Sequence, residues 1–193
     1  MQSGVNAPTA TWDAAGFLVP ALLIPTFFVD GFFHEGGHAV ACVLQGNSIT
    51  AWRLELPAET CCTSYNAISY AAGTVTSLAA WTVCTVIFAR WLLPRLRQAK
   101  WLQFSAVCWV DWSFWCLGEL VLWALQVRSQ PAQGIVPLPS DARSFVRLAG
   151  VNPILVIAVC LGVLAILLAG VFVPCAARVL RASREPISAT PAS

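Results

Sequence analysis

Two histidines with a glutamate between them are the residues of this chain best suited to catalysis. They lie in the stretch His34-Glu35-Gly36-Gly37-His38, and the sequence holds no other histidine. On a helix, residues four apart share a face, so both imidazoles can reach one Zn²⁺ while Glu35 is directed at a water on the metal. Zinc lowers the pKa of such a water toward ~7, and a neighbouring carboxylate can take its proton as it attacks a peptide carbonyl. The spacing therefore predicts His34 and His38 as zinc ligands and Glu35 as the general acid/base of a hydrolase.

A catalytic zinc usually has three protein ligands and one open position, so a further ligand is needed. Asp111, Glu119 and Asp141 are the acidic candidates. At ~1.5 Å per helical residue, Glu119 lies nearer than Asp111 to the depth of the two histidines, so depth favours Glu119. Asp141 precedes the last apolar segment, on the side where the first helix ends. It is equally suited to the N-cap or first turn of that last helix, so the residues alone leave the third ligand open.

Asp30 lies one helical turn before His34, on nearly the same stripe of the first helix. Carboxylates behind a zinc-binding histidine commonly accept the second imidazole N–H and so fix the ring and its tautomer. Asp30 is therefore expected to accept a hydrogen bond from a zinc-binding imidazole and to hold that ring in place. Cys42 continues the stripe, but the face has rotated by roughly 120° at that point, so Cys42 is expected to pack in the core.

The composition is that of an integral membrane protein. The chain is 58% hydrophobic and only 10% charged, with a mean hydropathy of +0.73, whereas an average soluble domain has roughly 25% charged residues. Its net charge of +2 is too small to indicate a nucleic-acid partner. The lipid bilayer is the partner that this composition requires.

Four segments are apolar and long enough to cross a bilayer, which takes about 20 helical residues. They predict an all-α polytopic membrane protein with about four transmembrane helices. Residues 1–182 are expected to form one membrane-embedded domain and residues 183–193, rich in Ser, Pro and Ala, a disordered tail. The four segments are residues 14–44, 67–89, 101–127 and 148–177.

The basic residues predict the orientation of these helices. Clusters at residues 90–100 and 178–184 fall on one side of a four-helix topology and hold seven basic residues, against four in the loops 45–66 and 128–147. Because short cytoplasmic loops carry the excess of Lys and Arg, both clusters and both termini are expected in the cytoplasm. The two loops with fewer basic residues are then external.

The first external loop has the alternating pattern of a short strand. Trp52, Leu54 and Leu56 alternate with charged residues up to Pro57, and residues 60–65 are suited to return as a second strand. A short β-hairpin is therefore expected between the first two helices. Its exposed edge could bind an extended peptide through these three apolar side chains, and an ordinary connecting hairpin is the competing interpretation.

Most of the eight cysteines fall in apolar segments, where thiols usually pack as small hydrophobic groups. Cys61 and Cys62 are the exceptions, because they are adjacent in the polar loop. An external disulfide or a metal-binding role is open to them, although neighbouring cysteines bridge each other poorly.

The segment FFHEGGHAVACVLQG, followed by the strand-like stretch, resembles the site-2 protease family of intramembrane zinc metalloproteases. Ala72-Gly73-Thr74 loosely matches a small-residue motif in the next helix, and SDARSFVRLAGVNP is similar to a pattern in a small bacterial branch. The resemblance implies His34 and His38 as ligands, Glu35 as acid/base and Asp141 as third ligand. It also implies membrane-spanning protein substrates and a bacterial inner membrane. The family's Asp-Gly signature at the third ligand is absent from Asp141-Ala142.

Three hypotheses for function follow. The preferred one is an intramembrane zinc metalloprotease that hydrolyses peptide bonds of membrane-spanning substrates. The second is a non-proteolytic membrane protein, a pseudoprotease or a chaperone, that keeps a structural zinc. The third has no metal, and the two histidines and Glu35 form a buried polar network or proton path.

Overall fold

The computed structural model describes residues 13–54, 59–96, 100–128 and 140–184. Most of these residues are helical, and a two-stranded antiparallel hairpin is the one sheet among them. The first half of the chain forms α1 (Asp13–Leu44), β1 (Ile49–Arg53), β2 (Glu59–Cys62) and α2 (Ala67–Ile87), which continues through the π-helical η1 (Phe88–Leu92) and the 3-10 turn η2 (Leu93–Arg95). The second half forms α3 (Lys100–Arg128), α4 (Asp141–Ala149), α5 (Pro153–Leu167), the π-helical η3 (Leu168–Phe172) and α6 (Val173–Arg184).

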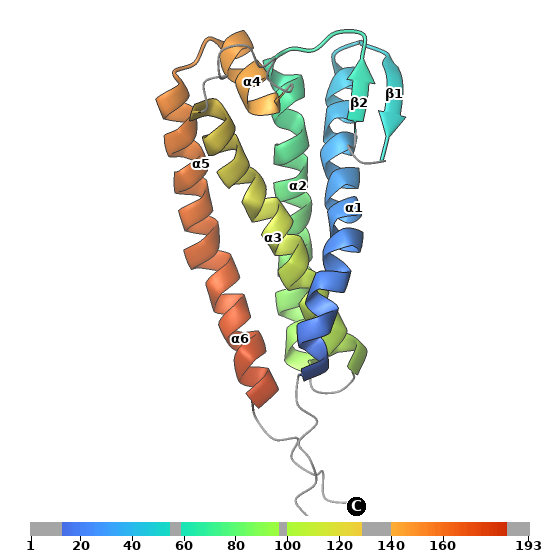
Figure 1. Cartoon of the computed structure of the whole chain (residues 1–193), viewed down its shortest axis with the longest axis vertical. Coiled ribbons are helices and arrows are strands. Elements are labelled where there is room, and N and C mark those ends of the chain that lie inside the picture. The colour runs from blue at the N-terminus through green and yellow to red at the C-terminus, as the bar shows by residue number, and fades with distance from the viewer. Residues whose placement is uncertain (1–12, 55–58, 97–99, 129–139, 185–193) are drawn as a thin grey trace, which may run out of the picture.

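The long helices form a bundle in which α1 packs against α2 and α3, and α5 packs against α3 (Figure 1). The hairpin and the short helix α4 lie together at one end of this bundle. The beginning of α1 and the end of α6 lie at the other end, where Figure 1 draws the blue and red termini of the described helices. The hairpin and α4, which are too short to cross a membrane, thus lie at the same end of the bundle.

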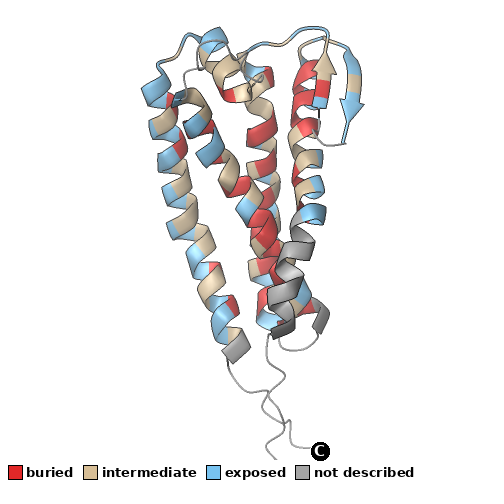
Figure 2. Ribbon diagram, viewed as in Figure 1, coloured by how far each residue is buried: buried red, intermediate tan, exposed pale blue. Residues whose placement is uncertain are grey.

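Among the residues that the structure describes, three helices are long and apolar enough to cross a membrane, namely Ala67–Arg95, Leu102–Arg128 and Pro153–Ala182. The last is the most apolar of the three and yet is the least buried inside the protein. Figure 2 shows its exposed residues in pale blue along α5 and α6, whereas buried residues lie inside the bundle on α1, α2 and above all α3. An apolar helix with an outward apolar surface is expected in lipid, so the chain has the character of a membrane protein.

The last predicted segment differs from the structure at its beginning. Residue 148 was expected to open a single helix, but α4 ends at Ala149 and α5 begins at Pro153. Gly150 closes α4 in the left-handed conformation, with φ of 64°, and Asn152 caps α5 by accepting a hydrogen bond from the backbone N–H of Ile154. These stop and start signals separate an amphipathic helix from the apolar span, and the end of the span runs past residue 177 to Arg184. Residues 185–193 of the expected tail lie outside the described residues.

The hairpin confirms the expected strand pair. Ile49 pairs with Cys62 and Arg53 with Glu59, so the second strand begins one residue before Thr60 and ends at Cys62 rather than at residue 65. Leu56 and Pro57 lie outside the described residues.

A disulfide joins Cys42 at the end of α1 to Cys62 on β2. Cys42 is fully buried, as expected of a core residue, but the expectation that it packs as an unpaired thiol was wrong. Its Cα lies 6.1 Å from that of Cys62, within the normal range for a disulfide. The return of the chain in β2 creates this proximity, which no local pattern around Cys42 indicates. The bond ties the hairpin to α1 beside the two histidines.

Candidate metal centre

The histidine motif lies in the part of α1 that faces α2 and α3. The ligand atoms of His34, Glu35 and His38 all lie within 4.8 Å of one another, and this group could hold a metal ion. The two imidazole rings meet edge to face, with centroids 4.8 Å apart. The structure thus confirms that the three residues come together on one side of the helix, as their spacing predicted.

Each imidazole is held from behind through its Nδ1 atom. His34 Nδ1 lies 2.7 Å from Oε1 of Glu119 on α3, and His38 Nδ1 lies 2.6 Å from the backbone carbonyl oxygen of Ser69 on α2. Both partners can only accept, because one is a carboxylate and the other a carbonyl, so both Nδ1 atoms carry the proton. In neutral rings the two Nε2 atoms then present free electron pairs.

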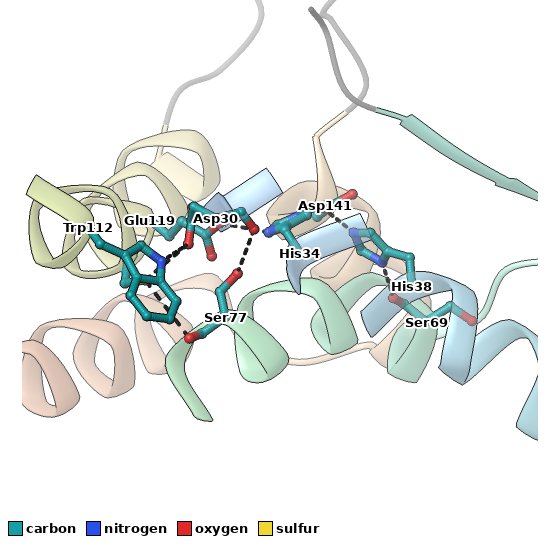
Figure 3. Close-up of polar contacts among 9 residues, drawn as sticks. Asp30, His34, His38, Ser69, Ser77, Trp112, Glu119 and Asp141 are labelled. Atoms are coloured by element: carbon teal, nitrogen blue, oxygen red, sulfur yellow. Dashed lines mark hydrogen bonds and ion pairs between the residues drawn. The ribbon is translucent and has the colours of Figure 1, made fainter. Parts of the chain in front are cut away.

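Both Nε2 atoms point at the same carboxylate oxygen, Oδ2 of Asp141 (Figure 3). The distances are 3.2 Å from His34 and 3.1 Å from His38. Two N or O ligands on one tetrahedral zinc, each at about 2.1 Å, lie ~3.4 Å apart. Oδ2 of Asp141 therefore lies from each Nε2 atom at about the distance that separates two ligands of one ion, and imidazole nitrogen and carboxylate oxygen are donors that Zn²⁺ prefers.

Without a cation between them, the two rings can face the Asp141 carboxylate only if they carry extra protons. Two electron pairs would face an anionic oxygen, unless each ring took a second proton. Two imidazolium rings would then lie side by side in a buried location, since the His38 side chain is only 6% exposed. A divalent cation resolves the conflict with neutral rings.

The beginning of α4 carries Asp141 to the histidines. Ser140 is the N-cap, and its hydroxyl accepts a hydrogen bond from the backbone N–H of Arg143. The Arg143 guanidinium in turn donates through Nε to the backbone carbonyl of Gln126 on α3, at 2.9 Å. Asp141 thus lies in the first turn of α4, and Ser140 rather than Asp141 is the N-cap. Both interactions fix the carboxylate over α1.

The environment keeps Asp141 charged. Burial raises the pKa of this carboxyl, whereas hydrogen bonds and positive charge from protonated His34 and His38 bring the pKa below its ordinary value. With neutral rings, a bound cation would supply that positive charge instead. An ionised carboxylate is the form that binds a metal.

Glycine at position 73 lets α2 approach the two imidazoles. A Cβ placed on Gly73 would lie 2.5 Å from Nε2 of His38 and 2.7 Å from Nε2 of His34. Gly37, within the motif, allows a similar approach, because its Cβ would lie 2.4 Å from the backbone oxygen of Ala72. Gly36 has no atom within 4 Å of such a Cβ. Close packing of α1 on α2 therefore depends on Gly37 and Gly73.

A cavity of about 790 Å³ opens beside the histidines. Glu35 lines it and is 7% exposed, and its backbone oxygen accepts a hydrogen bond of 3.0 Å from the hydroxyl of Thr60 on β2. The hairpin therefore forms one wall of the cavity and holds the α1 backbone at the motif. The walls are completed by α2, α3, α4 and the residues just before α2 and α4, and they include Tyr65, Tyr70, Thr74, Glu119, Leu122, Trp123, Gln126, Ser140 and Asp141.

Asp30 does not take the supporting role expected of it. Its Oδ1 accepts hydrogen bonds from Nε1 of Trp112 at 3.3 Å and from Sγ of Cys116 at 3.0 Å. Glu119 instead supports His34, so the depth argument placed Glu119 correctly beside the site but as the partner of Nδ1. Asp30 thus links α1 to α3 one turn away from the metal centre.

Asp111 lies outside the metal centre. Its side chain is buried, with 1% exposure, and its Oδ2 has no hydrogen-bond partner among the described residues. It precedes Glu119 by eight residues on α3, which corresponds to roughly 12 Å along the helix. Glu119 therefore contacts His34, whereas Asp111 lies about two helical turns further from the site along α3.

The apolar residues of the hairpin face away from the cavity. Trp52 is 48% exposed, and its ring lies 5.8 Å from that of Phe32 on α1. Leu54, just after β1, is 37% exposed. Neither residue lines the cavity, and Leu56 lies outside the described residues.

Cys61 lines the cavity next to the disulfide, as a free thiol. Its hydrogen bond to Glu59 raises the pKa of the thiol. Cys61 does not belong to the group of metal-binding side chains that come together at His34, Glu35 and His38.

Comparison of the chain with protein-family models, curated proteins and solved structures gives no match.

Proposed function

We propose that the protein is an intramembrane zinc metallopeptidase. The observation that carries this proposal is the convergence of Nε2 of His34, Nε2 of His38 and Oδ2 of Asp141, with both Nδ1 atoms already committed as donors. His34, His38 and Asp141 hold the metal, and Glu119 and the Ser69 carbonyl orient the imidazoles. Three protein ligands leave a position open toward the cavity, as a catalytic zinc site requires.

The chain's own residues divide the work of peptide hydrolysis. A bound zinc supplies Lewis-acid activation of water and polarisation of the peptide carbonyl. Glu35 takes the proton from the attacking water and returns it to the leaving amine. The surrounding helices and β2 limit access of other water to the reacting groups.

Replacing Glu35 by glutamine tests this assignment. Glutamine keeps the shape of the side chain but cannot accept the proton, so hydrolysis is expected to fall below detection while one zinc per chain stays bound. The measurement is cleavage of fluorescein-labelled casein and of a panel of single-span transmembrane peptides in detergent, together with metal analysis of the same preparations.

The possible outcomes separate the hypotheses for function. A Glu35→Gln variant that cleaves at the wild-type rate would remove Glu35 from the mechanism. A wild-type protein that holds zinc but cleaves nothing would favour a structural zinc, and one that holds no metal at all would favour a polar network of the two histidines.

We propose that α1 is a fourth membrane-crossing helix, and that both termini are cytoplasmic in a bacterial inner membrane. The beginning of α1 and the end of α6 lie at the same end of the bundle, as an even number of crossings requires. The disulfide between Cys42 and Cys62 supports placing the hairpin end outside the cytoplasm, because disulfides persist in oxidising compartments. This agrees with the excess of basic residues at the other end.

Labelling of Cys61 tests the orientation. A membrane-impermeant maleimide added to spheroplasts that express the protein is expected to modify the wild type, because Cys61 is a free thiol on the external hairpin. A Cys61→Ser variant is the matched control and should stay unlabelled, since the other free cysteines lie in helices α2, α3, α5 and α6. Labelling that appears only after the membrane is permeabilised would contradict the proposed topology.

We propose that substrates are membrane-spanning proteins that reach the cavity in an extended conformation. A peptide in an active site must expose its carbonyl groups, so a substrate helix has to unwind. The outer edge of β1, which has no strand partner among the described residues, could pair with a flanking part of the unwound segment on the far side of the cavity wall formed by β2.

A further inference from the structure

Thr74 has the one hydroxyl on α2 that is buried without a hydrogen bond. Its side chain is 5% exposed, and Oγ1 has no partner among the described residues. The other buried hydroxyls of this fully described helix all have partners. Ser69 contacts Gln45 and Asn66, Ser77 donates to the backbone oxygen of Asp30, and Thr85 accepts from the indole of Trp109.

The position of Thr74 relates this unpaired hydroxyl to the metal centre. Thr74 follows Gly73, whose Cα faces both Nε2 atoms, and it lines the same cavity as Glu35 and Asp141. A buried hydroxyl without a partner costs free energy, and this cost is recovered when a molecule in the cavity accepts its hydrogen bond. The hydroxyl thus has no partner within the part of the chain that the structure describes, and it belongs to a residue that lines the cavity.

The cavity otherwise offers mostly acceptors. Glu35, Glu59, Glu119 and Asp141 contribute carboxylates to its walls. Of the other hydroxyls there, Thr60 donates to the backbone oxygen of Glu35 and Tyr65 donates to that of Thr60. The hydroxyls of Tyr70 and Ser140 also line the cavity, but both residues are only half-buried, so Thr74 has the one buried hydroxyl of the lining without a partner among the described residues. Hydrolysis of a peptide places negative charge on the carbonyl oxygen, which requires a donor.

We infer that Thr74 is a catalytic residue that donates its hydroxyl hydrogen to the carbonyl oxygen of the scissile peptide bond. The inference rests on the proposed peptidase function and deepens it. The hydrogen bond strengthens as that oxygen becomes negatively charged, so Thr74 stabilises the transition state more than the bound substrate.

Thr74→Val is the decisive variant, because valine keeps the shape of threonine and removes the hydroxyl. We expect kcat on the peptides that the wild type cleaves to fall roughly 10²- to 10³-fold, the usual loss for one such donor, with KM changed by only a few-fold. Zinc content should equal that of the wild type. Thr74→Ser, which restores a hydroxyl, should recover most of the lost kcat.

A second measurement is independent of turnover. A phosphinic analogue of a cleaved peptide carries a charged oxygen in place of the carbonyl oxygen, and its affinity should fall by a similar factor in Thr74→Val. Thr82→Val is the matched control, since Thr82 lies on the exposed face of the same helix and donates to the backbone oxygen of Leu78. This control should keep wild-type kcat and analogue affinity.

Two results would overturn the inference in different ways. Equal kcat and equal analogue affinity in wild type and Thr74→Val, with zinc bound in both, would remove Thr74 from catalysis and leave the peptidase proposal intact. Absence of any cleavage by the zinc-loaded wild type would overturn the peptidase proposal and the role of Thr74 with it.

Discussion

A Gly73→Ala variant is expected to lose its zinc. The added methyl group would lie 2.5 Å and 2.7 Å from the Nε2 atoms of His38 and His34, which is closer than non-bonded atoms approach. The rings cannot retreat without breaking the contacts of their Nδ1 atoms with Ser69 and Glu119. Metal content measured by mass spectrometry should therefore fall to background, and hydrolysis should disappear with it.

The matched control is Gly36→Ala, in the histidine motif itself. A Cβ at Gly36 meets no atom within 4 Å, so this variant should retain wild-type zinc. Circular dichroism and the elution volume in detergent should match the wild type for both variants, which shows that the bundle is folded. A folded Gly73→Ala protein with full zinc content would mean that the Nε2 atoms are not the ligands.

Replacement of Asp141 by asparagine is expected to weaken zinc binding more than replacement of any other acid in the bundle. The Oδ2 atom of Asp141 is the only carboxylate oxygen within 3.2 Å of both Nε2 atoms among the described residues. Glu119→Gln removes only the support of His34, for which a 10- to 100-fold loss of affinity is usual. Asp141→Asn should exceed that loss, as measured by competition with a chromogenic chelator.

Asp111→Asn is the control for charge and burial in this series. Asp111 is a buried acid on α3 but does not contact either histidine, so zinc affinity should be unchanged. A ranking in which Glu119→Gln loses more zinc affinity than Asp141→Asn would identify Glu119 as the third ligand. The series thus decides a question that the sequence left open.

Features with a local cause were predictable from the sequence. The approach of His34 and His38 follows from 3.6 residues per turn, and the expected hairpin follows from the alternation around Trp52. The apolar segments likewise indicated membrane-crossing helices, and three described helices meet that criterion.

Features that depend on the rotation of one helix against another were not predictable. Asp30 and Glu119 were both candidates to contact His34, and nothing in the sequence shows which way α3 turns toward α1. Trp112 and Cys116 occupy the carboxylate of Asp30, so Glu119 reaches the ring instead. The packing of α3 therefore determines which acid supports the ligand.

Pairings across long stretches of chain were missed for a related reason. The disulfide of Cys42 forms only because β2 brings Cys62, 20 residues later in the chain, back to α1. The acceptor for His38 is a backbone carbonyl, which cannot be recognised from the residue type. The small-residue pattern around Gly73 did point to α2, but only the packed helices show that it faces the imidazoles.

The metal centre draws one contact from each of several helices, and this has a consequence for biogenesis. During synthesis the two histidines emerge first. Their partners follow later in the chain, namely Ser69 on α2, Glu119 on α3 and Asp141 on α4. A partly inserted chain therefore lacks a complete coordination sphere. Under the proposed peptidase function, hydrolysis therefore could not begin before translation has passed α4.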